Sequence, residues 1–215
     1  FFPMLEATFE TSRERVSVCE ACVDSIPATC STHVFAVCVT RDGVPLVGVR
    51  RTSFAYQAVT LRRRNANITP VARELLRYMY ASELKDIYSR LPRSCRLRAP
   101  EGVRFEELVL LGGCLHKQES VTECLAREIR EESDSRLSAR RFGARALKIC
   151  IFDKLLTKQY SGYCMLCFVE QRLDDVQHAT LYNFEVCRLC SLLEKSDNEK
   201  FEYLHFIYNS LVTTK

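Results

Sequence analysis

The segment from Gly113 to Asp134 constrains the fold of this chain most strongly. An aliphatic run at residues 108–111 and a Gly112-Gly113 turn signal precede it. Ser120 and Glu123 have the spacing of a capping box, in which each residue satisfies a free backbone N–H of the other. The sequence therefore predicts a strand, a tight turn and a helix that runs from Val121 to about Glu132.

Three glutamates share one face of this predicted helix, because Glu128, Glu131 and Glu132 are spaced i, i+3 and i+4. Like charges at this spacing repel each other, so helix stability gives no reason for them. Hard divalent cations would make the arrangement favourable, since they bind carboxylate and phosphate oxygens together. Leu125 and Ile129 form the neighbouring apolar stripe, which would anchor the helix to a core.

The simpler alternative is a solvated acidic helix face with Arg127 and Arg130 as partners. The wider pattern favours the metal site, because the segment matches the Nudix box, G-x5-E-x7-R-E-U-x-E-E-x-G-U, in which U is aliphatic. The six matching positions are Gly113, Glu119, Arg127, Glu128, Glu131 and Glu132. At the end of the box, Asp134 and Ser135 replace the glycine and the aliphatic residue. Aspartate tolerates a left-handed backbone, so we expect the loop to survive.

The rest of the chain alternates between strand and helix patterns. We expect a hairpin at residues 33–39 and 45–50, a helical insertion at about 70–92, and strands at 146–152, 163–170 and 184–189. We also expect an amphipathic C-terminal helix with a start signal at Ser196 and Asp197 and an apolar stripe from Phe201 to Leu211. Residues 1–30 have weak periodicity. Strands around one central helix, with the other helices in an insertion and at the end, predict an α+β fold.

Twelve cysteines raise the question of disulfides or zinc. Cys164 and Cys167 form one of three CxxC pairs, but they lie in a strand-like run, where residues three apart point to opposite faces. We therefore interpret them as small buried hydrophobic residues rather than zinc ligands. The first residues lack the basic flank of a signal peptide, and no run approaches the roughly 20 apolar residues of a membrane span. We expect a reduced, cytosolic protein without membrane contact.

Clustered arginines suggest contact with a polyanion, although the formal net charge is only +4. Arg50-Arg51 and Arg62-Arg63 are the candidates for RNA binding. Ordinary solvated loops are an equally good interpretation of either cluster.

Beyond the box, the chain resembles the poxvirus mRNA-decapping Nudix hydrolases over nearly its full length. The segments that carry the resemblance are 32–36, 50–55, 110–113, 124–125, 153–155 and 162–165. The resemblance implies an α/β/α sandwich core with a helical insertion and a C-terminal helix, and dependence on Mg²⁺ or Mn²⁺. It also implies capped mRNA as substrate, release of 7-methyl-GDP and 5′-monophosphate RNA, mRNA turnover and host shutoff, and the cytoplasm of the infected cell as location. No obligate protein partner is evident.

The same resemblance implies roles for particular acidic residues. Glu119, Glu128, Glu132 and Asp153 are the expected metal ligands, and Arg127 would orient Glu119 or another helix carboxylate. Glu128 or Glu131 would accept the proton from the attacking water, and the sequence leaves open which of the two does so.

A site for 7-methylguanine needs aromatic faces on both sides of a flat cation and a carboxylate for its N1 and N2 donors. Phe54, just after a predicted strand, and Tyr160, in a predicted loop after Asp153, are the candidates for the sandwich. Glu14 or Asp153 would take the base edge. The alternative for either ring is a place in the core.

This interpretation divides the chain into two parts. Residues 1–30 would be an N-terminal segment that contributes to the cap-binding lobe, and residues 31–215 would be the Nudix domain.

Two other functions stay open, a pyrophosphatase that acts on free nucleotides and a catalytically dead Nudix scaffold that binds RNA. The intact glutamates argue against the scaffold, whereas the altered tail of the box argues weakly for it.

Overall fold

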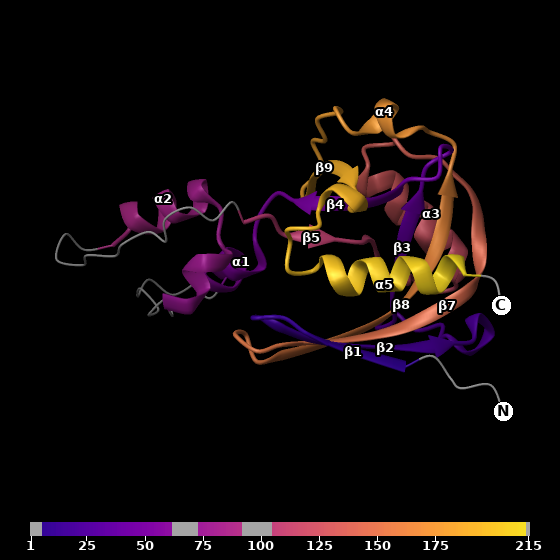
Figure 1. The fold of residues 1–215 in the computed structure, drawn as a ribbon, viewed down its shortest axis with the longest axis horizontal. Helices are drawn as coiled ribbons and strands as arrows, with labels where there is room; N and C mark the ends of the chain where they lie inside the picture. Colours follow the sequence, from indigo (N-terminus) through magenta and orange to yellow (C-terminus); the bar gives the residue numbers. More distant parts are fainter. Residues whose placement is uncertain (1–5, 62–72, 92–104, 214–215) are drawn as a thin grey trace. The chain divides into compact units, whose positions relative to one another are not determined.

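A computed structural model of the chain describes residues 6–61, 73–91 and 105–213. The described residues divide into two compact units. The first comprises the chain up to Val49 and from Leu108 onwards, and the second comprises Arg50–Glu107. The first unit is built on a mixed sheet of nine strands in the described residues, with the order β1-β2-β7-β8-β3-β4-β5 (Figure 1). Strand β6 pairs with β3 and β9 pairs with β4 outside this path.

The strands are β1 (Glu6–Glu10), β2 (Glu14–Ala21), β3 (His33–Val39), β4 (Pro45–Arg50), β5 (Leu108–Val109), β6 (Leu111–Cys114), β7 (Ala139–Asp153), β8 (Lys158–Val169) and β9 (Val186–Ser191). The helices are α1 (Phe54–Leu61), α2 (Ala81–Ser89), α3 (Val121–Glu132), α4 (Leu173–Val176) and α5 (Phe201–Val212), with 3-10 turns η1 (Val23–Ser25), η3 (Arg73–Tyr78) and η4 (Leu192–Glu194). β3 and β8 run parallel, whereas β7 is antiparallel to both β2 and β8.

Alternating side chains of the central strands supply two apolar layers. On β8, Met165 and Cys167 belong to one cluster, with α3, and Cys164 and Leu166 belong to the other, with α5. This division follows from the period of two along a strand. Helices α3 and α5 therefore cover opposite faces of the sheet (Figure 1). Cys164 and Cys167 lie on opposite faces, as the sequence predicts, and each cysteine that the structure describes is free.

The second unit is held together by buried polar contacts. Glu83 of α2 accepts hydrogen bonds from the backbone N–H of Ser53 and of Tyr80, both at 2.8 Å. Its carboxylate also accepts the Ser53 hydroxyl, and Ser53 in turn caps α1 by accepting from the N–H of Tyr56 at 3.0 Å. These contacts fix where α1 begins, immediately after Ser53.

Several expected elements are confirmed. The fold is α+β, β3 and β4 have the expected bounds, and α3 runs from Val121 to Glu132. The C-terminal helix α5 is present but begins at Phe201, after the start expected at Ser196 and Asp197. The Ser120–Glu123 capping box is present, with the Glu123 N–H donating to the Ser120 hydroxyl and the Ser120 N–H donating to the Glu123 carboxylate. In the described part of the chain, no helix is long and apolar enough to span a membrane.

The structure adds three features to the expected organisation. In the N-terminal segment, β2 pairs with β7 over eight positions and so belongs to the main sheet. The described part of the helical insertion is the 3-10 turn η3 and the helix α2, with Tyr80 in an extended conformation between them, and so it is not one continuous helix. Helix α1, which begins at Phe54, is an element that the sequence patterns do not predict.

Candidate active site

The site is built on α3 and on the β6 strand beside it. Leu125 and Ile129 are fully buried and fix the helix against the sheet, so the opposite face presents its charged side chains. Gly113 of β6 lies directly under Glu128. A Cβ atom at Gly113 would approach the Glu128 carboxylate oxygen to 2.3 Å, so glycine leaves the space that this carboxylate occupies.

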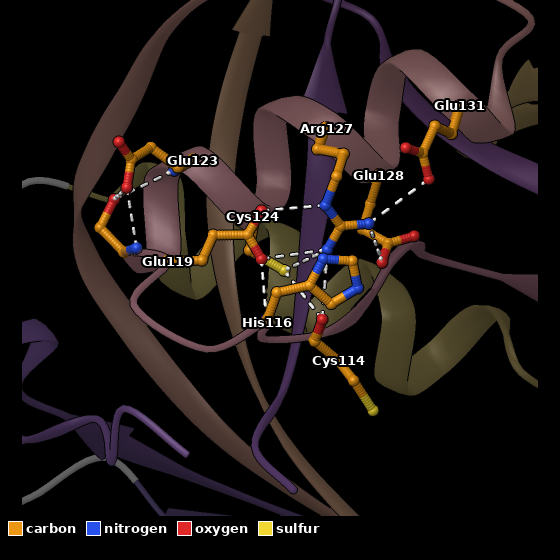
Figure 2. A network of polar contacts seen from close by, with 9 residues as sticks. Cys114, His116, Glu119, Glu123, Cys124, Arg127, Glu128 and Glu131 are labelled. Carbon is orange, nitrogen blue, oxygen red and sulfur yellow. Dashed lines mark hydrogen bonds and ion pairs between the residues drawn. The ribbon is translucent and has the colours of Figure 1, made fainter. Parts of the chain in front are cut away.

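Arg127 connects three of the predicted acidic residues (Figure 2). Its Nε and Nη2 donate to the two oxygens of Glu119 at 2.9 and 3.1 Å. Its Nη1 donates to Glu128 at 2.7 Å and, more weakly, to Glu131 at 3.4 Å. Nη2 also donates to the backbone carbonyl of Cys114 at 3.2 Å, which ties the guanidinium to β6. The like charges that the sequence places together are thus partly neutralised by a cation of the same helix.

The electrostatics follow from this guanidinium. Hydrogen bonds from Arg127, followed by the N–H of His116, lower the pKa of Glu119 to about 2. The carboxylates of Glu119 and Glu128 raise the pKa of Arg127 well above its ordinary value. Burial raises the pKa of the Cys124 thiol to about 12, so this thiol on the buried face of α3 stays protonated. Glu119 and Arg127 are therefore a permanently charged pair over the neutral pH range.

The other two glutamates of the box differ in how firmly they are held. The Glu132 carboxylate accepts a hydrogen bond from the N–H of Gly112 at 2.8 Å. The Glu131 side chain is 55% exposed, and its contact with Arg127 is long, at 3.4 Å. Glu128, Glu131 and Glu132 are the acidic side chains on one face of α3, as the spacing predicts.

The altered tail of the box keeps a left-handed backbone. Asp134 has φ 49° and Ser135 has φ 60°, which are conformations that glycine adopts most easily. Asp134 also uses its carboxylate, which glycine lacks, to accept hydrogen bonds from the N–H groups of Tyr182 and Asn183. The expectation that aspartate preserves this loop is confirmed.

Two further predicted residues meet at one end of the sheet. Glu14 and Asp153 are direct register partners of β2 and β7. Arg13 donates to Asp153 through Nε and Nη2, both at 2.8 Å, and the N–H groups of residues 155 and 156 donate to the other Asp153 oxygen. Glu14 accepts from Lys200 at 3.3 Å and from the Tyr203 hydroxyl at 3.0 Å. Two cations thus balance two buried carboxylates.

Comparisons with known proteins identify the family. No family model matches the chain. An mRNA-decapping protein of vaccinia virus (strain Western Reserve) is 46% identical over 210 residues, which cover 98% of this chain and 97% of the relative. An mRNA-decapping protein of rabbit fibroma virus is 43% identical over 209 residues, which cover 97% of this chain and 99% of the relative. A fowlpox virus protein that carries the name Nudix hydrolase is 45% identical over 97% of this chain and 89% of its own length.

The chain belongs to the poxvirus mRNA-decapping Nudix hydrolases. Within this decapping protein, the structure divides the predicted cap residues between the two units. Tyr160 lies on β8, where it pairs with Ile151 of β7, and not in a loop as the sequence suggested. Its side chain is 49% exposed, so it is not a core residue. Tyr160 therefore shares a sheet end with Glu14 and Asp153.

Phe54 belongs to the second unit of the decapping protein. It begins α1 and is half-buried, and its N–H donates to the buried Glu107 carboxylate at 3.1 Å. The guanidinium carbon of Arg50 lies 4.1 Å from the centre of the Phe54 ring. The ring therefore already accepts a flat cation on one of its faces.

The structure describes two of the four arginines predicted to bind RNA, Arg50 and Arg51. Arg50 is only 5% exposed, and Nη1 donates to the carbonyl of Thr52 and to the side chain of Gln57, both at 3.1 Å. These contacts tie the guanidinium to the start of α1, and RNA binding by Arg50 stays a prediction. Arg51 is exposed, as an RNA contact requires, and Arg62 and Arg63 lie outside the described residues.

Sequence reasoning missed the two cations that bind the Asp153 and Glu14 carboxylates. Arg13 is 1% exposed and Lys200 is 5% exposed, although neither belongs to an arginine cluster. Their partners are 140 and 186 positions away in the chain. The alternation of Val16 and Val18 could have revealed β2, but no local signal reveals these pairings.

Proposed function

We propose that this chain removes the cap from mRNA, hydrolysing the cap bridge to release 7-methyl-GDP and 5′-monophosphate RNA. The observation that carries the proposal is the complete set of box carboxylates, ordered around Arg127, in a chain of the decapping family. The consequences would be mRNA turnover and shutoff of host protein synthesis in the cytoplasm of the infected cell. The two helices on opposite sheet faces support assignment to the Nudix α/β/α sandwich.

The donor set fits a hard divalent cation, Mg²⁺ or Mn²⁺, in chemical type. Glu128, Glu131 and Glu132 supply carboxylate oxygens on one helix face, and Gly113 leaves room for the Glu128 carboxylate. The three side chains would have to move together to bind the ion, because the described residues contain no group of three acidic, histidine or cysteine side chains arranged to hold a metal ion. When bound, the ion would neutralise phosphate charge and lower the pKa of a water molecule.

All four expected ligands accept hydrogen bonds, and two of them, Glu119 and Asp153, do so through both carboxylate oxygens. Both oxygens of Glu119 accept from Arg127, so we assign Glu119 the role of fixing that arginine. Both oxygens of Asp153 accept protein hydrogen bonds, so it could bind a metal ion only after leaving Arg13. We therefore propose Glu128, Glu131 and Glu132 as the metal ligands.

The chain's own groups define the chemistry around the cap bridge. Glu128 or Glu131 would accept the proton of the attacking water. Glu131 has the weaker contact with Arg127 and is the more exposed of the two, so its carboxylate is the freer to accept a proton. Arg127 would hold the remaining carboxylates in place during turnover.

For cap recognition, we propose Phe54 and Tyr160, each within its own unit, as candidate aromatic contacts of 7-methylguanine. Arg50 lies over one face of the Phe54 ring, so the base would stack on the other face. The 49% exposure of Tyr160 supports a stacking role for its ring. Glu14 and Asp153 lie at the same sheet end as Tyr160, and either would have to exchange a present donor for the N1 and N2 groups of the base.

A comparison of substrates tests the proposal against free-nucleotide hydrolysis. Turnover of long capped RNA, the cap dinucleotide and nucleoside triphosphates is measured at several salt concentrations. A decapping enzyme should cleave the long RNA much faster, and its RNA affinity should fall steeply with salt as phosphate contacts are lost. Equal rates on free nucleotides with no salt dependence on RNA would favour the pyrophosphatase. Binding of capped RNA without any cleavage would favour the scaffold.

A further inference from the structure

Two aromatic side chains project from a loop beside the end of the proposed catalytic helix. Tyr182 is 85% exposed and Phe184 is 84% exposed, and they are the most exposed large hydrophobic side chains in the described part of the chain. Single exposed apolar residues are common in proteins, but two large rings separated by one residue need an explanation.

The loop that carries these rings is firmly held. Leu181 and Val186, on either side of the two rings, are buried at 1% and 0% exposure, and the Leu181 N–H donates to the Cys187 carbonyl at 3.2 Å. Asn183, between the rings, accepts from the N–H of Glu185 at 2.6 Å and of Val186 at 3.2 Å. The rings are thus displayed on an ordered turn.

The same loop is tied directly to the catalytic helix. The Asn183 side-chain amide donates to the backbone carbonyl of Glu131 at 2.9 Å. The Asp134 carboxylate accepts from the N–H groups of Tyr182 and Asn183. The residue that replaces the box glycine therefore positions the exposed rings next to the last turn of α3.

Resting on the proposed function, we infer that Tyr182 and Phe184 form a stacking platform for unpaired bases of the RNA body. Aromatic faces stack with any base, and rings on an ordered loop lose little conformational entropy on binding. A capped transcript in the site necessarily brings its first nucleotides to α3. Three exposed arginines supply positive charge for the phosphates: Arg130 and Arg136, which flank Asp134 in the sequence, and Arg188, which follows the loop. Glu185 is the acidic residue within the loop.

The test measures binding of an uncapped, unstructured 5′-monophosphate RNA oligonucleotide in the absence of divalent metal. Tyr182→Ala and Phe184→Ala should each weaken the affinity about 5- to 100-fold, which corresponds to the loss of one stacked base. The aromatic exchange Tyr182→Phe/Phe184→Tyr should retain it. Leu193→Ala, which shortens a side chain that is 50% exposed on another element, is the matched control and should have no effect.

Asp134→Gly tests the anchor, because glycine retains the left-handed backbone and removes only the carboxylate. It should also weaken RNA binding, and unchanged affinity would overturn the positioning role of Asp134. For the alanine variants, unchanged affinity would overturn the platform, as would a change in self-association in sedimentation experiments without any change in RNA affinity. Because this assay needs neither a cap nor cleavage, its result is independent of whether the chain decaps RNA.

Discussion

Arg127 donates two hydrogen bonds to the Glu119 carboxylate, from Nε at 2.9 Å and from Nη2 at 3.1 Å. This pair explains why the Nudix spacing places an arginine in the middle of an acidic helix. The arginine orders Glu119 and Glu128 and offsets the repulsion among carboxylates that would otherwise weaken the helix. Glu131 and Glu132, on the same helix face, are the residues that we propose as metal ligands together with Glu128.

The Glu119–Arg127 pair should make stability depend on pH. The folded-state pKa of Glu119 is lowered to about 2 from 4.5, so its contribution is fully present above about pH 4.5 and is lost as the pH falls towards 2. The difference in melting temperature between wild type and Glu119→Gln should shrink across this window. A difference that stays constant from pH 7 to pH 2.5 would contradict the assignment.

Glu132→Gln should lower turnover by about 100-fold or more and leave the fold intact. The glutamine carbonyl can still accept the N–H of Gly112, so the structural contact survives while the charge is lost. Glu131→Gln should behave in the same way, because this side chain is largely exposed. Glu202→Gln, on the exposed part of α5, is the control. Turnover and melting temperature are measured on all variants, and near-normal turnover by a folded Glu132→Gln protein would count against the site.

Alanine substitution at the adjacent residues Gly112 and Gly113 should have different effects, on stability at the first and on turnover at the second. At Gly112, with φ +149°, a Cβ atom would lie 2.1 Å from the backbone oxygen of Val34, so Gly112→Ala should destabilise the protein by about 3 kcal/mol or more. At Gly113 the Cβ would meet the end of the Glu128 side chain, which can move away. Gly113→Ala should therefore lower turnover about 10- to 100-fold with little change in unfolding free energy. Denaturation midpoints and rates for both variants check this, and equal destabilisation would disprove it.

Phe54→Ala and Tyr160→Ala should each cost about 1–3 kcal/mol in binding of methylated caps. Because Tyr160 is half-exposed, its replacement should leave the melting temperature nearly unchanged. Phe54→Ala also removes the contact with Arg50, so a small loss of stability is expected there. Affinity for methylated and unmethylated cap dinucleotides distinguishes this role from packing. If either variant binds and cleaves caps normally, its residue is not part of the cap site.

Helix α3 was predictable because its signals are local. The capping box, the apolar stripe and the spacing of the glutamates all lie between Ser120 and Glu132, and the bounds are as expected. The contacts that tune the site were not predictable. Arg13 meets Asp153 across 140 positions, and Glu83 of α2 accepts the N–H of Ser53 across 30 positions. Such pairings arise only once distant strands and helices pack together.

The identity of the product released from capped RNA tests the central claim most directly. RNA with a labelled cap is incubated with the wild-type chain, with Mg²⁺ or Mn²⁺ or with a chelator, and beside Glu132→Gln. The account predicts 7-methyl-GDP and 5′-monophosphate RNA from the wild type with metal, and neither product with chelator or from the variant. Release of 7-methyl-GMP, or equal release by Glu132→Gln, would contradict it.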